Sequence, residues 1–194
     1  EIQSGPEFFA CQMCRTMDSM GTGYMMRSRD YEAVDGIPSM YPRLIFADYE
    51  LWMRLILLSY KATTGENLFL YRVHNNTSLL TNGEQYQQAF EKYVHFIHGL
   101  MKTNSEIENT VQKYGHDFLM YFCESLSHRI LKSPADTRKV KVDDFIEKCK
   151  GYAALLIPGQ EFNPMDKKRI RLAKQLDATF IGRTAFQLYK KLKL

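Results

Sequence analysis

The sequence predicts an α+β chain that is predominantly helical, with short strands and helices up to about residue 82 and an α-helical bundle after it. Up to that point, short apolar runs are broken by glycine and proline. After the turn signal Thr81-Asn82-Gly83, apolar residues recur every three or four positions over long stretches. The 194 residues, 45% of them hydrophobic, can bury one substantial core or a core plus an appendage. We therefore expect two units, residues 1–82 and residues 83–194.

The elements expected in the first unit are short. Its best-supported helix follows Ala47, because Leu51, Leu55 and Leu58 recur at helical spacing. Elsewhere, glycine and proline set the limits, and Gly36 is expected to occupy a turn with positive φ. In chain order we expect a helix from Pro6 to about Met17, a strand at 24–26, a brief helix with Ser28 as N-cap, a helix at 47–59, and strands at 61–64 and 68–73.

The second unit is expected to contain helices only. Long helical periodicity runs over residues 84–102 and again over about 107–131. A third helix is expected at 142–156, and one or two more after Pro164. These lengths suit helices that pack side by side in a bundle.

The C-terminal segment 165–194 is strongly basic, although the whole chain has a net charge of only +4. It holds nine Lys or Arg residues against Asp166 and Asp177, and apolar residues are interleaved with its cations. Such a segment can lie on an anionic membrane surface as a peripheral contact. It can equally be a terminal helix docked on the bundle with a solvated face. No nucleic-acid-binding motif is present, so a nucleic acid is not expected as a partner.

Residues 1–20 lack the basic start and apolar run of a signal peptide, and no apolar run is long enough to cross a bilayer. We therefore expect a cytoplasmic protein, with peripheral contact at the inner face of the membrane as an option. The four cysteines fit this expectation. Cys11 and Cys14 form a single C-x-x-C without the further ligands of a zinc site, and we expect buried or half-buried thiols.

Taken from the residues alone, Asp48 has two interpretations. It stands at the start of the 47–59 helix, where the helix dipole favours the ionised carboxylate, so it can serve as a general base or simply cap the helix. Glu50 is too far around the helix to pair with it and is instead spaced for an ion pair with Arg54. Trp52, one turn beyond Asp48, can stack on a sugar or belong to the core.

Four motifs follow one another between residues 20 and 80: Arg27-Ser28-Arg29, Gly36-Ile37-Pro38, Phe46-Ala47-Asp48-Tyr49-Glu50-Leu51-Trp52-Met53-Arg54-Leu55, and Leu70-Tyr71-Arg72-Val73-His74. This series resembles the acceptor-side half of a family 2 glycosyltransferase of the GT-A fold. The resemblance implies that residues 1–82 are the C-terminal part of a GT-A α/β domain. It also implies that the nucleotide-binding half is missing from this chain, since no Asp-x-Asp occurs in it.

The resemblance assigns roles to particular residues. It implies that Asp48 is the general base, and that His74 is a ligand of Mn²⁺ or Mg²⁺ whose other ligands come from the missing half. Ala47 replaces the acidic residue that many relatives carry before the base, and Asp35 stands where relatives often have glycine. The remaining substrate-binding residues implied are Trp52, Arg27, Arg72 and Gly36.

The function so implied is an inverting glycosyl transfer from a nucleotide-diphospho-sugar donor to a glycan or lipid-linked acceptor. The Gln-x-x-Arg-Trp motif of processive synthases is absent, so the enzyme is expected to be non-processive. As an incomplete part of the enzyme, the chain alone is expected to be inactive. The alternative is a non-catalytic helical interaction module that docks onto a protein or membrane surface through its basic tail.

Overall fold

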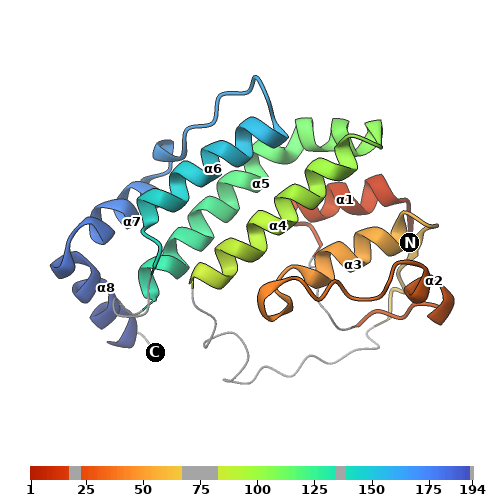
Figure 1. Ribbon diagram of the computed structural model, residues 1–194, viewed down its shortest axis with the longest axis horizontal. Coiled ribbons are helices and arrows are strands. Elements are labelled where there is room, and N and C mark those ends of the chain that lie inside the picture. The colour runs from red at the N-terminus through yellow and green to blue at the C-terminus, as the bar shows by residue number, and fades with distance from the viewer. Residues whose placement is uncertain (18–22, 67–82, 134–138, 193–194) are drawn as a thin grey trace.

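The structure, a computed structural model, describes residues 1–17, 23–66, 83–133 and 139–192 (Figure 1). Within these ranges it contains eight α-helices, two 3-10 turns and one two-stranded sheet. The helices are α1 (Gly5–Cys14), α2 (Ser28–Ala33), α3 (Ala47–Ile56), α4 (Gly83–Met101), α5 (Ser105–Lys132), α6 (Val142–Leu156), α7 (Lys168–Ala178) and α8 (Phe180–Leu192). The strands are β1 (Ile2–Gln3) and β2 (Lys61–Ala62), and the 3-10 turns are η1 (Pro42–Leu44) and η2 (Pro164–Asp166).

Helix α5 is the centre of the fold. It runs beside α4 and α6, and α1 and α7 also pack against it (Figure 1). Its start is fixed by Asn104, whose side chain accepts hydrogen bonds from the backbone N–H groups of Glu106 and Ile107 at 3.0 and 3.1 Å. Although α5 is 28 residues long, no helix in the described ranges is both long and apolar enough to cross a membrane.

Aromatic rings fill the space between α4 and α5. The ring of Phe122 lies 4.8 Å from that of Phe90 and 4.9 Å from that of Phe118, measured between centroids. Phe46, which precedes α3, joins the same cluster at 5.3 Å from Phe122. One buried core thus contains residues from both sides of residue 82, because the aromatic side chains of the first part pack directly onto the bundle.

The sheet of the described residues is a single antiparallel pair. Ile2 is opposite Ala62 and Gln3 is opposite Lys61. The strand expected at 61–64 therefore forms in part, but its partner is the start of the chain. The strand expected at 24–26 is wrong, since those residues make no ladder, and the strand expected at 68–73 lies outside the described residues.

The predominantly helical class is confirmed, and the helix expected at 142–156 has those bounds. The expectation that residues 1–82 form part of a GT-A α/β domain is wrong. The described portion of that segment has three helices and only two residues in each strand. The physical reason is visible in α1, which starts with a capping box between Ser4 and Glu7 and buries Phe8 and Phe9. Its apolar residues face the bundle, so they provide no layer over a sheet.

The cysteines are as expected. Cys11 and Cys14 are half-buried, Cys123 and Cys149 are buried, and none forms a disulfide. Burial raises the pKa of the Cys149 thiol well above its usual value, and the neighbouring Cys123 adds to that rise. Both thiols are core residues, Cys123 on α5 and Cys149 on α6.

Candidate functional site

The first turn of α3 starts from an unusual backbone conformation. Phe46 has φ 64°, in the left-handed region that non-glycine residues seldom occupy. Its ring lies 5.5 Å from that of Tyr93 in a stacked arrangement. Burial of this ring in the aromatic cluster offsets the backbone strain. The packing of Phe46 therefore fixes where α3 begins and where the following Asp48 is held.

Asp48 is half-buried at the second position of α3. Its Oδ1 accepts a hydrogen bond from the backbone N–H of Tyr49 at 3.0 Å. Burial raises the pKa of Asp48, and backbone hydrogen bonds from Tyr49 and Asp48 itself oppose the rise. The backbone N–H groups at the start of the helix favour the ionised form of Asp48, as expected, but desolvation outweighs them and the net shift of the pKa is upward.

Glu50 is a structural residue. It is only 1% exposed. Tyr41 donates its hydroxyl to Glu50 Oε2, and Arg54 forms the predicted ion pair with Oε1. Burial and the bond to Glu50 raise the pKa of the Tyr41 phenol well above its usual range. These contacts attach the segment before α3 to the helix.

Trp52 is 6% exposed, and its ring stacks on Tyr24 with centroids 4.3 Å apart. Tyr24, which belongs to the predicted strand at 24–26, therefore covers one face of the indole. The arrangement corresponds to the packing role that we considered for Trp52. Its role as a substrate-binding residue stays a prediction.

Arg27 and Gly36 lie at the two ends of the α2 segment. Arg27, not Ser28, occupies the N-cap position, and its guanidinium is 3.8 Å from the carboxylate of Asp30. Gly36 has φ +69°, as expected for its turn. A Cβ at Gly36 would lie 2.9 Å from the ring of Tyr31, so close packing also requires glycine there.

Arg72 and His74 lie outside the described residues, so their roles stay predictions. Within the described ranges, no three His, Cys, Asp or Glu side chains gather closely enough to hold a metal ion. The described residues therefore provide no site that fits Mn²⁺ or Mg²⁺.

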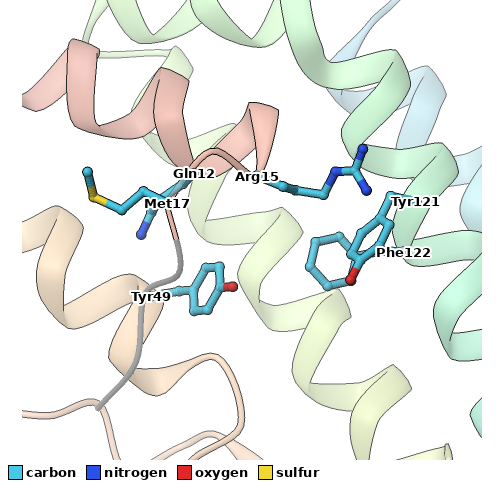
Figure 2. Close-up of a pocket in the computed structure, with 6 residues that line it drawn as sticks. All are labelled: Gln12, Arg15, Met17, Tyr49, Tyr121 and Phe122. Atoms are coloured by element: carbon cyan, nitrogen blue, oxygen red, sulfur yellow. The ribbon is translucent and has the colours of Figure 1, made fainter. Parts of the chain in front are cut away.

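A pocket opens between the end of α1, the start of α3 and the middle of α5 (Figure 2). The hydroxyl of Tyr49 points across it toward α5, and Arg15 extends over the ring of Tyr121 with its guanidinium carbon 4.2 Å from the ring centroid. Such a cation–π contact keeps the cation of Arg15 beside the opening. The lining residues are Gln12, Arg15, Met17, Tyr49, Tyr121 and Phe122.

The pocket and Asp48 are parts of one neighbourhood. Tyr49 lines the pocket and donates its backbone N–H to Asp48. The ring of Tyr93 packs edge-on against that of Tyr49, and the Tyr93 hydroxyl donates to Gln12 Oε1 at 3.3 Å. Burial raises the pKa of Tyr93 well above its usual value, and the charges of Tyr49, Glu50 and Asp48 add to the rise. Asp48 is not among the lining residues, but its neighbour Tyr49 is, so a half-buried carboxylate stands one residue from a small pocket with aromatic walls and one cation.

Sequence reasoning singled out Asp48, whose role stays a prediction, but missed the pocket. Its lining residues come from three segments that are more than 30 residues apart, and only the packing of α1 and α3 on α5 brings them together. Nothing in the sequence indicated that Arg15 lines a pocket, because its position depends on the left-handed conformation (φ 58°) that ends α1.

Comparison of this sequence with models of known protein families, with curated proteins and with solved structures gave no match. Together with the helical architecture of the described residues, this result overturns the resemblance to the family 2, GT-A glycosyltransferases. Any function must therefore be argued from the site itself.

Proposed function

We propose that the site at α3 activates a hydroxyl group, with Asp48 as the general base. The observation that carries this proposal is a half-buried carboxylate with a raised pKa in the neighbourhood of a pocket. A general base is most effective when its pKa approaches the working pH, and desolvation moves Asp48 in that direction. An attacking hydroxyl would transfer its proton to this carboxylate as its oxygen forms the new bond.

The reaction that we propose is inverting, non-processive glycosyl transfer from a nucleotide-diphospho-sugar to a glycan or lipid-linked acceptor. The acceptor sugar would lie against Tyr49 and Phe122, which offer apolar faces. Arg15 supplies a guanidinium that can contact phosphate oxygens.

The test measures release of nucleoside diphosphate from a panel of nucleotide sugars, using the protein that the complete gene encodes and Mn²⁺ in the buffer. Asp48→Asn keeps the size of the side chain and the acceptor for Tyr49, so we expect folding to persist and kcat/KM to fall by at least 100-fold. The matched control is Asp117→Asn, which removes a carboxylate that is 90% exposed.

The pH profile distinguishes a base from a structural residue. For wild type we expect kcat/KM to fall on the acidic side with an apparent pKa above 3.8, the ordinary value for this residue. Absence of turnover on every donor, or turnover that is unchanged in Asp48→Asn, would contradict the proposal. An equal loss in Asp117→Asn would show that the effect is not specific to the site.

A second candidate function is a helical interaction module that docks through the basic segment 165–194. It is favoured by α8, which directs large apolar side chains into solvent. The test follows the chain in cells by fractionation into membrane, high-mass and free pools. We expect substitution of the exposed apolar residues of α8 to return the chain to the free pool, and an unchanged distribution would exclude docking through this helix.

A further inference from the structure

Helix α8 exposes an apolar stripe. Phe180, Ile181 and Leu188 are 70%, 80% and 56% exposed, and they fall within an arc of about 100° around the helix. Phe186, on the opposite side, packs against the core. The helix therefore has two apolar sides, and only one of them is used for folding.

The orientation of α8 is fixed by contacts at its start and in its middle. At its start, the backbone N–H of Gly182 donates to Thr179 Oγ1 at 3.0 Å, and a Cβ at Gly182 would lie 2.6 Å from the carbonyl oxygen of Leu176. Further along, Gln187 Nε2 donates to the carbonyl of Ser133, after α5, at 3.3 Å. These contacts hold the stripe away from the bundle.

Most charges of segment 165–194 are positive, and Asp166 is the one exposed acid among its residues. Of the nine cations after residue 165, Arg169 pairs with Glu124 at 3.0 Å and Lys174 pairs with Asp143 at 2.6 Å. One of the two acids, Asp177, is buried and accepts a hydrogen bond from the backbone N–H of Val142. It therefore offers no negative charge at the surface.

The remaining cations of α7 and its start are available to a partner. Lys167, Lys168 and Arg171 are exposed, and within the described part of the chain none of them forms an ion pair. Leu172, on the same side of α7, is also exposed. Two more lysines, Lys190 and Lys191, belong to the last turn of α8 by sequence.

We propose that α8 lies in the surface of an anionic lipid bilayer, with Phe180, Ile181 and Leu188 inserted and the exposed cations Lys167, Lys168 and Arg171 above the headgroups. This inference rests on the docking function proposed above and names its partner. A helix with large apolar residues on one side and lysine and arginine around them is the type that binds such surfaces. Each basic residue near the surface adds to the attraction.

Figure 1 gives the geometry for this contact. Helices α7 and α8 form one end of the molecule, drawn in blue, and α3 lies toward the other end. A bilayer at α8 would therefore leave the neighbourhood of Asp48 accessible. The docking surface and the candidate catalytic site can be tested independently.

The experiment is co-sedimentation with vesicles of phosphatidylcholine alone and of phosphatidylcholine mixed with phosphatidylserine. We expect wild type to partition at least tenfold more strongly onto the anionic vesicles, and this preference to weaken in high salt. The double variant Ile181→Ser, Leu188→Ser should partition at least tenfold less, because it loses two inserted side chains. The matched control is Met25→Ser, Leu58→Ser, which alters residues that are 100% and 54% exposed outside α7 and α8.

Circular dichroism confirms first that both variants fold. The inference is overturned if wild type ignores anionic vesicles, if the α8 variant binds as wild type does, or if the control loses as much. The protein could instead dimerise through Ile181 and Leu188 in a concentration-dependent way and not bind vesicles. That result would assign the stripe to a second copy of the chain and would also overturn the inference. If fractionation shows an α8-dependent high-mass pool without vesicle binding, docking stands and the bilayer is excluded.

Discussion

Substitution of Gly83 tests how α4 meets α5. A Cβ built on Gly83 lies 2.6 Å from Cα and 2.8 Å from the backbone N of Ile130, whereas ordinary contacts begin at 3.4 Å. Backbone atoms cannot rotate away, so Gly83→Ala must separate the two helices by about 0.8 Å at this point. The shift also lengthens the hydrogen bond from Gly83 N–H to Ser133 Oγ, now 3.0 Å.

The expected cost combines two effects. Overpacking costs about 1–3 kcal/mol, and weakening one hydrogen bond adds about 1 kcal/mol, which gives a loss of about 2–4 kcal/mol for Gly83→Ala. Gly99 on the same helix is the matched control, because a Cβ there meets nothing within 4 Å. Gly99→Ala should stabilise the protein by about 0.5–1 kcal/mol through its lower backbone entropy in the unfolded state.

Urea denaturation followed by circular dichroism measures both changes, and a thermal scan gives an independent check. At about 2–4 °C per kcal/mol, Gly83→Ala should lower Tm by about 4–16 °C while Gly99→Ala raises it slightly. If the two variants change the free energy of unfolding in the same direction and by similar amounts, the close approach of α4 and α5 is wrong.

Two further predictions concern the acids of α3. Because the pKa of Asp48 is raised in the folded protein, its ionisation destabilises the fold as pH rises through that pKa. Asp48→Asn should therefore increase the free energy of unfolding at pH 7, and the gain should vanish below the ordinary value of 3.8, as urea titrations at several pH values would show. Glu50→Ala should lower the free energy of unfolding by about 3 kcal/mol, since the Tyr41 hydroxyl and Arg54 lose their shared partner. A loss below about 0.5 kcal/mol in the same urea assay would contradict the structural role of Glu50.

Patterns within one segment of the sequence were sufficient to predict helix bounds and contacts that lie within that segment. The periodicity of residues 142–156 and the turn signal before Gly83 predicted α6 and the start of α4 within a residue. The i,i+4 spacing of Glu50 and Arg54 likewise predicted their ion pair. Helix periodicity and side-chain spacing are properties of one segment, so no knowledge of its neighbours is needed.

The N-terminal part was predicted less well, because its short elements depend on their partners. Residues 24–26 have the apolar character of a strand, yet Tyr24 packs on Trp52 instead of joining a ladder. The pairing of Ile2 with Ala62 joins positions about 60 residues apart, and nothing in either segment specifies the other. The motifs that suggested a glycosyltransferase domain were in the same way local patterns without the sheet that the fold requires.

The sequence by itself determined the helical class, the bounds of the long helices and the basic character of the C-terminal segment, because periodicity and charge are written in consecutive residues. Only the tertiary structure decided the pocket at Arg15 and Tyr49, the desolvation that raises the pKa of Asp48, and the side of α8 that faces solvent. These features depend on which distant side chains exclude water from a given atom. Burial is a property of the packed molecule, and a single segment of sequence does not contain it.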